Sequence, residues 1–333
     1  MYNEINVRFI SENFFRRLIM LYIITTGDYE LIEQIATDIM ESRNDVSIIH
    51  TGRICCSKIK KIESYLLCML GVPVVNILSD TVINEISNIK EKDSVLLWFS
   101  ETMPEIFAVS SLITSKKKSV WLWNTMSHNL LKSMLLVKLK KWMNFYTFDE
   151  EDAKKFGIKY KTQVCYDIKK FISNSKISTS TDLYFCGVDK GRYKIIADLY
   201  YNLLAQGLKC DFNIVPDKHS KNIIVPELKS NGIGLIENVE RLNSTKCVLE
   251  IMKKGQRGLT LRTLEAMILG KKLITNNKYI TNFSFYSPEN ILIIQNIFDA
   301  KQIADFINST TYNNNQPGWF EKYMPTSWVK DFI

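Results

Sequence analysis

The feature that most constrains this chain is an end-to-end alternation of short apolar runs with helix-length amphipathic segments. The first half predicts strands at 18–25, 46–50, 73–78, 94–99, 119–123 and 145–148. Helical patterns lie between them, at 29–42, 57–70, 81–90, 103–114, 128–143 and 149–156. Strands that are apolar throughout are covered by helices on both faces, and such alternation is typical of a parallel sheet. The sequence therefore predicts an α/β fold.

The alternation restarts after a polar stretch rich in Ser, Thr, Asn and Lys. It predicts strands at 182–186, 210–215, 233–236, 246–251, 272–275 and 291–294, and helices at 190–206, 238–245, 260–269 and 299–309. We expect two Rossmann-like domains at 1–166 and 182–315, a linker at 167–181, and an aromatic-rich closing helix at 316–333 that packs back on the first domain. Two such domains would face each other across a cleft at the carboxyl ends of their strands. Residues 1–19 belong either to this core or to an upstream extension.

Composition narrows the class of protein. The chain has 333 residues, 46% of them apolar and 23% charged, so it can bury a full core. No apolar run reaches the roughly 18–20 residues of a membrane span. The seven cysteines form no CxxC pair. This odd number, without a disulfide framework or metal-ligand spacing, indicates a reducing, cytoplasmic location and no metal site.

The positive charge is concentrated in one segment. The formal net charge is +8, and the segment Phe107–Phe148 holds seven lysines and no Asp or Glu, the lysines being Lys116, Lys117, Lys118, Lys132, Lys138, Lys140 and Lys141. This pattern favours an anionic partner, either the headgroups of a membrane surface or a phosphorylated substrate. Nucleic acid is disfavoured because no aromatic residues alternate with basic ones on the strands.

A first candidate anion site follows the strand at 182–186. In "YFCGVDKGRYKII", Gly187 and Gly191 allow close backbone approach, and Lys190 and Arg192 stand where the next helix begins. We expect the N–H groups of that helix to be available to an anion. The alternative is an ordinary turn whose basic residues are solvated, because the stretch is neither GxGxxG nor a P-loop.

A second candidate anion site follows the strand at 246–251. In "GQRGLTLRTLEA", Gly258 precedes Thr260, which we expect to cap a helix, and Arg262 lies in the first turn of that helix. A cation is unfavourable there unless an anion is near. Arg262 would then bind a diphosphate and Glu265 a ribose diol. The alternative is a simple ion pair between Arg262 and Glu265.

Three segments carry a resemblance. "GVDKGR" at 187–192, "CVLEIMKKGQRGLTLRTLEA" at 247–266 and "GKKLITNN" at 270–277 resemble bacterial glycosyltransferases of lipopolysaccharide, O-antigen and capsule synthesis, which are similar to the two-Rossmann-domain GT-B class. The resemblance implies that the second domain binds a nucleoside-diphosphate sugar, with Lys190 and Arg192 on the diphosphate and Glu265 on the ribose. Many relatives carry two glutamates eight positions apart, but position 257 is Arg here, which leaves Glu250 and Gln256 as candidates for the donor sugar.

The resemblance also implies a lipid-linked glycan as acceptor and no cofactor or metal. The enzyme would be cytoplasmic and associated peripherally with the inner face of the membrane, through lysines 116–141. Acceptor-side catalysis is assigned to His128 and Glu101, each near a strand end, with His50 and Asp28 left open as alternative bases. Two rival functions are a nucleotide-sugar epimerase and a catalytically idle scaffold of the synthesis complex.

Overall fold

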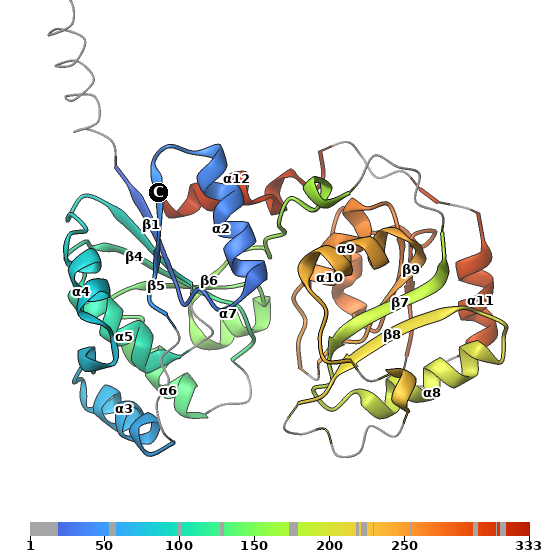
Figure 1. Cartoon of the computed structure of the whole chain (residues 1–333), viewed down its shortest axis with the longest axis horizontal. Helices are drawn as coiled ribbons and strands as arrows, with labels where there is room; N and C mark the ends of the chain where they lie inside the picture. The colour runs from blue at the N-terminus through green and yellow to red at the C-terminus, as the bar shows by residue number, and fades with distance from the viewer. Residues whose placement is uncertain are drawn as a thin grey trace, which may run out of the picture. The chain divides into compact units, whose positions relative to one another are not determined.

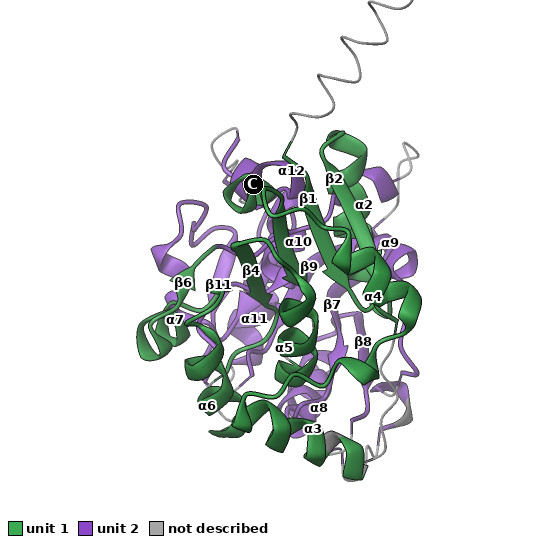
Figure 2. Ribbon diagram, turned by 90° about the vertical axis from the view of Figure 1, so that its left-hand side faces the viewer, with its two compact units in different colours: residues 1–161, 328–333 green, residues 162–327 purple. Residues whose placement is uncertain are grey.

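The computed structural model describes residues 19–52, 58–98, 102–126, 130–172, 179–217, 220, 225–228, 230–253, 255–295, 299–310, 312–313 and 318–333 (Figure 1). The chain divides into two compact units, which Figure 2 colours separately. Unit 1 comprises residues 1–161 and 328–333, and unit 2 comprises residues 162–327. The segment 167–181 and residues 316–327 therefore belong to unit 2, and the last six residues belong to unit 1.

Unit 1 is built on a parallel sheet with the order β2-β1-β3-β4-β5-β6. Its strands are β1 Leu21–Thr25, β2 Val46–His50, β3 Ser94–Trp98, β4 Lys117–Leu122, β5 Asn144–Thr147 and β6 Lys159–Tyr160. Its helices are α2 Glu30–Ser42, α3 Lys58–Leu70, α4 Asp80–Ser87, α5 Met103–Leu112, α6 Leu130–Leu139 and α7 Glu150–Phe156. Because β2 and β3 lie on opposite sides of β1, the chain reverses direction across the sheet between β1 and β3.

Alternate side chains of these strands fill two apolar layers. Ile24, Leu97 and Val120 point into a core with buried side chains of α3 to α6. Trp98 and Trp121 point to the opposite face, where Trp328 stacks on Trp98 at 5.4 Å and meets Trp121 edge-on at 4.9 Å between ring centroids. The closing residues of the chain thus seal one face of this sheet.

Unit 2 is built on a second parallel sheet, with the order β11-β10-β9-β7-β8. Its strands are β7 Thr181–Val188, β8 Cys210–Val215, β9 Thr245–Glu250, β10 Lys272–Thr275 and β11 Ile291–Ile293. Its longer helices are α8 Tyr193–Leu204, α9 Leu235–Asn243, α10 Leu261–Ile268 and α11 Ala300–Asn308. The core between sheet and helices includes Phe185, Leu199, Ile274 and Ile303. Because β8 and β9 lie on opposite sides of β7, the strand order reverses between β7 and β9. The carboxyl ends of these two strands are therefore the topological switch point of unit 2.

The α/β prediction is confirmed, and two predicted strands are wrong. Residues 73–78 hold a short 3-10 turn, η1 Val75–Ile77, with no fully buried side chain. Residues 233–236 lead into α9, whose N-cap is Gly234, and Ile236 is exposed. Both runs are apolar enough for a strand, but a strand inside a parallel sheet is buried on both faces, and these residues are not. No helix of the described residues is long and apolar enough to cross a bilayer.

Candidate functional site

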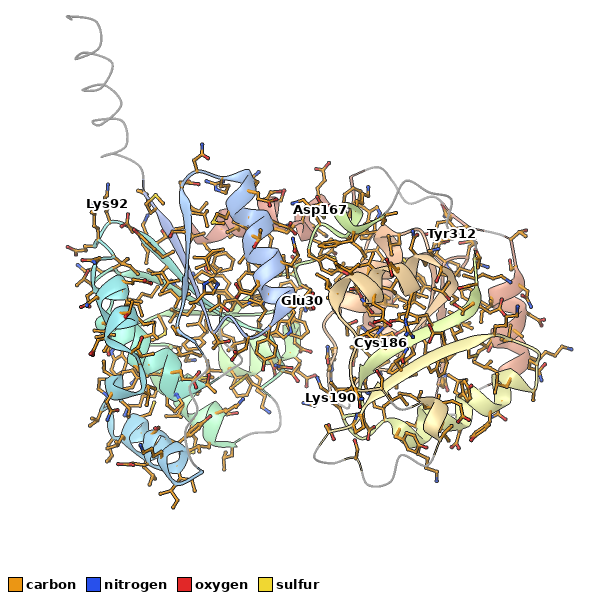
Figure 3. All side chains as sticks on the ribbon, in the orientation of Figure 1. Glu30, Lys92, Asp167, Cys186, Lys190 and Tyr312 are labelled. Atoms are coloured by element: carbon orange, nitrogen blue, oxygen red, sulfur yellow. The ribbon has the colours of Figure 1, made fainter. Side chains whose placement is uncertain are left out.

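The two loops with the candidate anion sites lie side by side at the carboxyl ends of the strands in unit 2. The first follows β7 and the second follows β9, and β7 and β9 are neighbouring parallel strands. Figure 3 labels Cys186 near the end of β7 and Lys190 in the loop beyond it. Since ligands of such sheets bind outside the carboxyl ends of strands at the switch point, this edge is the best-placed site of unit 2.

Two arginines from different loops converge here. A Cβ atom on Gly187 would lie 3.0 Å from Nη2 of Arg262 and 3.6 Å from Nη2 of Arg192. The guanidinium carbons lie 4.9 Å and 5.6 Å from the ring centroid of Phe185 for Arg262 and Arg192, respectively. Glycine at 187 therefore leaves room for both guanidinium groups, and a side chain there would make the end of Arg262 shift.

The two guanidinium groups are held mainly by backbone carbonyl groups. Arg192 donates from Nε to the carbonyl oxygen of Asp189 at 3.0 Å and through its other nitrogens to those of Val188 and Ile251. Arg262 donates to the carbonyl oxygen of Cys186. Burial, followed by the positive charge of Arg262, lowers the pKa of Arg192 to about 10. The carboxylates of Asp189, Glu250 and Asp217 act on Arg192 in the opposite direction. An anion bound between the two guanidinium groups would be attracted by both of them.

The start of α8 differs from our expectation. The carboxylate of Asp189 accepts from the backbone N–H groups of Arg192 at 2.8 Å and Tyr193 at 2.7 Å, and its other oxygen accepts from Ser220. An internal carboxylate therefore already occupies two of the N–H groups that we expected to be available to an external anion. Asp189 stands three residues before Arg192 in "GVDKGR", a capping spacing that the sequence analysis overlooked.

The loop residues beside Asp189 adopt left-handed backbone conformations. Gly191 has φ 78° and Lys190 has φ 47°, a region that residues with a Cβ seldom occupy. The backbone N–H of Lys190 donates to Asp217 at 3.2 Å. These two backbone conformations and the hydrogen bond to Asp217 fix the loop in a tight turn, and Lys190 stands two residues before Arg192.

We expected Glu250 to face the donor sugar, but its side chain is fully buried. Its carboxylate accepts hydrogen bonds from the hydroxyl groups of three threonines, Thr260, Thr263 at 2.7 Å and Thr275 at 2.5 Å. These donors come from the N-cap and first turn of α10 and from the end of β10. Glu250 therefore ties the start of α10 to the sheet and positions the loop between them; it does not present a free carboxylate to a sugar.

Glu265 lies inside a hydrogen-bonded chain of side chains. Its Oε1 accepts from the hydroxyl of Tyr166 at 2.8 Å and from the amide of Asn238 at 3.4 Å, and Asn238 in turn accepts from Tyr184 at 2.9 Å. Burial raises the pKa of Glu265, and the Tyr166 hydrogen bond and the charge of Arg262 oppose that rise. The sequence analysis missed Tyr166 and Asn238, because neither stands near the motif in the chain.

The remaining sequence-predicted residues of this loop have distinct positions. Thr260 caps α10 by accepting from the N–H of Thr263 at 3.4 Å, as predicted. Gly258 is buried, whereas Gln256 is half-buried in a turn closed by its N–H and the carbonyl of Lys253. Arg257, which replaces the glutamate of the resembling enzymes, is exposed and lies over Tyr279 at 4.8 Å from the ring centroid.

A separate pair of side chains occupies the carboxyl edge of the sheet in unit 1. Nε2 of His50, at the end of β2, lies 2.5 Å from Oε2 of Glu33 in α2. Gly27, with φ 75°, follows β1, and a Cβ there would lie 3.3 Å from Cδ2 of His50. His128 and Glu101, to which the sequence analysis assigned catalysis, lie outside the described residues.

The predicted lysine surface is partly wrong. Lys118 donates to the carbonyl oxygens of Ser110 and Ile113, while Lys138 and Lys140 donate to those of Met69 and Phe156. These carbonyls stand at or near the C-terminal ends of α5, α3 and α7, where a helix dipole favours a cation. Three of the seven lysines thus cap helices.

In the parts of the chain that the structure describes, no three His, Cys, Asp or Glu side chains are grouped so as to hold a metal ion.

Comparisons with known proteins identify the fold. No family model and no curated protein matches the sequence. The solved structures that match include a UDP-forming α,α-trehalose-phosphate synthase from Burkholderia xenovorans in complex with glucose-6-phosphate, with TM-score 0.59, 9% identity, and 94% of this chain and 98% of that chain covered. AviGT4, a glycosyltransferase of avilamycin A biosynthesis, matches with TM-score 0.54, 8% identity, and 94% and 96% covered. The UDP-GlcNAc 2-epimerase of Methanocaldococcus jannaschii, in complex with UDP-GlcNAc and UDP, matches with TM-score 0.50, 13% identity, and 94% and 98% covered.

These likenesses establish the fold class. The chain consists of two Rossmann-like parallel-sheet units of the kind found in GT-B glycosyltransferases. At such low sequence identity the comparison defines the architecture and not the reaction.

Proposed function

We propose that this protein is a glycosyltransferase that uses a nucleoside-diphosphate sugar as donor. The observation that carries the proposal is the convergence of Arg192 and Arg262 over Gly187 at the switch point of unit 2. A site with two adjacent guanidinium groups suits a dianionic diphosphate, because each arginine offers planar donors to phosphate oxygens. The solved structures of similar fold include enzymes that act on nucleotide sugars, which supports this choice of anion.

The reaction follows from this charge distribution. The bond between the anomeric carbon and the diphosphate oxygen breaks, the acceptor hydroxyl oxygen bonds to the anomeric carbon, and the hydroxyl proton passes to a base. Negative charge grows on the departing diphosphate, so Arg192, Arg262 and Lys190 stabilise the transition state more than the ground state. Glu265 would accept from a ribose hydroxyl through Oε2, since Tyr166 and Asn238 both bond to Oε1.

The base on the acceptor side has four candidates. His128 and Glu101 remain proposals from sequence. His50 and Asp28 are the candidates among the described residues, and His50 is favoured because Glu33 contacts its ring at the carboxyl ends of the strands in unit 1. A carboxylate partner fixes the orientation of an imidazole, which is what a general base requires.

The finer assignment follows the resemblance of the sequence to enzymes of lipopolysaccharide, O-antigen and capsule synthesis. We propose a lipid-linked or core surface glycan as the acceptor and peripheral attachment at the inner face of the membrane. Two alternatives remain. A nucleotide-sugar epimerase is favoured by the likeness to an epimerase fold, and would need no acceptor. A catalytically idle scaffold would need neither donor nor acceptor.

The donor site is tested by measuring thermal stability with and without nucleoside diphosphates and their sugars. A ligand at 100 times its dissociation constant adds about 2.7 kcal/mol to the free energy of unfolding. We expect one nucleoside diphosphate to stabilise the wild type, and its effect to vanish in Arg192→Ala and Arg262→Ala. Arg241→Ala is the matched control, because Arg241 forms ion pairs with Asp211 and Glu237 in the same unit and should leave the shift unchanged.

The absence of any nucleotide effect on a well-folded wild type would favour the scaffold. Release of free epimerised sugar nucleotide, without transfer to an acceptor, would favour the epimerase.

We further propose that transfer needs no metal ion, because the arginines supply the positive charge at the diphosphate. Excess EDTA should leave the rate of sugar transfer within about twofold of the untreated enzyme, whereas a metal that supplies Lewis-acid stabilisation is worth several kcal/mol.

A further inference from the structure

Helix α3 has its apolar stripe on the outside. Ile59, Ile62, Leu66 and Leu70 recur at spacings of three and four residues, which places them on one face of the helix, and all are between 60% and 79% exposed. The face turned inward carries the buried Ser64 and Cys68, and the partly buried Tyr65 and Met69 pack against the core. The outer face is therefore apolar as well, where a surface helix of a globular protein normally carries polar residues.

Helix α6 repeats this pattern. Leu130, Met134 and Val137 are exposed at helical spacing, at 79%, 48% and 47%, while Leu135 and Leu139 are buried. The neighbouring Leu131 is 40% exposed. The two stripes therefore belong to helices that already have an apolar core contact, so neither stripe is needed to hold unit 1 together.

A hydrogen bond links the two helices. Nζ of Lys138 in α6 donates to the carbonyl oxygen of Met69 in α3, and both views place α3 and α6 at the same end of unit 1 (Figures 1 and 2). Trp142, just beyond α6, stacks on Phe107 of α5 at 5.6 Å between ring centroids and is still 51% exposed. We call these exposed apolar side chains of α3 and α6, together with Trp142, the α3–α6 face.

We infer that the α3–α6 face docks unit 1 onto the interface of an anionic lipid bilayer. The chemistry fits that occupant. Exposed lysines accompany the apolar side chains, among them Lys60 and Lys141. The residues of α3 and α6 include a single acidic side chain, Glu63, and the segment Phe107–Phe148 has none. Helices with aliphatic side chains on one face, flanked by lysine, lie in the bilayer interface, and Trp is enriched at that depth.

This inference replaces the lysine-based membrane surface with an apolar one. Because Lys118, Lys138 and Lys140 are engaged in capping helices, electrostatic attraction alone is weaker than the sequence indicates. Insertion of aliphatic side chains would then supply most of the affinity, and the remaining lysines would select anionic lipid. The inference does not depend on the donor site, since every residue of the α3–α6 face belongs to unit 1.

The test is co-sedimentation of the full chain with vesicles of phosphatidylcholine alone and of equal parts phosphatidylcholine and phosphatidylglycerol. Wild type should sediment with the mixed vesicles, and the double variant Leu66→Glu/Met134→Glu should lose at least about tenfold in partitioning, because two inserted side chains are replaced by charges. Ile236→Glu is the matched control, since Ile236 is 57% exposed on α9 in unit 2. Lys141→Glu should weaken only the binding to mixed vesicles.

The depth to which Trp142 enters the bilayer is tested by quenching of tryptophan fluorescence with brominated lipids. This quenching should be largely lost in Trp142→Phe. All variants change exposed residues, so their melting temperatures and any nucleotide-induced shift should match the wild type, which separates this inference from the donor site. Failure of the wild type to bind vesicles, or equal loss in Ile236→Glu, overturns it. A dimer that Leu66→Glu/Met134→Glu dissociates, without vesicle binding, overturns it in favour of a second copy of the chain.

Discussion

Arg192 and Arg262 approach the same glycine from two different loops of unit 2. Their Nη2 atoms stand 3.6 Å and 3.0 Å from where a Cβ of Gly187 would be. Both also lie against the ring of Phe185, which helps to hold two like charges in one place through cation–π contact. Gly187 leaves space for both arginines, and the arginines place two positive charges beside each other.

Gly187→Ala tests the steric requirement. The added methyl group should push the end of Arg262 aside by a few tenths of an ångström. The atom that it meets is the end of a flexible side chain, so we expect a cost at the low end of the roughly 1–3 kcal/mol that overpacking carries in the free energy of unfolding. The shift of Arg262 should also reduce the nucleotide-induced thermal stabilisation. Cys186→Ala, which adds no atoms, serves as control. An unaltered nucleotide shift in Gly187→Ala would show that Arg262 does not need its observed position.

Glu265→Gln tests the cost of a buried carboxylate. The pKa of Glu265 is raised above its ordinary value of 4.5, so the folded protein binds more protons than the unfolded chain between 4.5 and the raised pKa. Stability of the wild type relative to Glu265→Gln should therefore fall as pH increases across that window, by about 1.4 kcal/mol for each unit of pKa shift, and then level off. Urea unfolding of both proteins from pH 4 to pH 8 measures this difference in the free energy of unfolding. A difference that does not vary with pH would mean that the pKa is not raised.

The same variant should lose nucleotide-induced stabilisation at pH 7, because an amide has a single acceptor oxygen and Tyr166 and Asn238 both donate to one oxygen of Glu265. Tyr166→Phe provides the comparison. It removes the hydrogen bond to Oε1 and leaves Oε2 in place, so it should weaken nucleotide binding less than Glu265→Gln does.

Glu250→Gln tests a structural role. The carboxylate accepts from three threonine hydroxyls in the interior, and an amide can accept through only one of its two terminal atoms. We expect a loss of about 1–3 kcal/mol in the free energy of unfolding. Glu237→Gln, on an exposed face of α9, should change stability by less than about 0.5 kcal/mol. Wild-type stability together with abolished transfer in Glu250→Gln would instead place Glu250 on the donor.

His50→Gln and Glu33→Gln test the acceptor-side base. If His50 removes the acceptor proton, kcat should fall about 10²–10⁴-fold in His50→Gln. The loss should be smaller in Glu33→Gln, which keeps the imidazole but loses the carboxylate beside Nε2. Asp28→Asn is the discriminating variant. A large loss of kcat there, with normal activity in His50→Gln, would transfer the role to Asp28.

Local sequence patterns predicted several elements of unit 2 correctly. The limits of β8 and β10 were predicted as observed, and Thr260 was identified as the cap of α10. The errors share one cause. Whether an apolar run joins a sheet depends on whether the sheet has a place for it, and the runs at 73–78 and 233–236 had none. Likewise, the caps made by Lys118, Lys138 and Lys140 join residues through folding and leave no periodic trace.

Periodicity, together with glycine and capping residues close in the chain, was enough to predict the α/β class, the positions of most strands, and the two loops of unit 2 that hold the basic residues. The role of each charged group depends instead on how the chain folds. The tertiary structure brought Arg192 and Arg262 together, buried Glu250 among threonines, paired Tyr166 with Glu265 and turned the stripes of α3 and α6 outward. Burial and hydrogen-bond partners depend on residues tens of positions apart, and no local pattern encodes them.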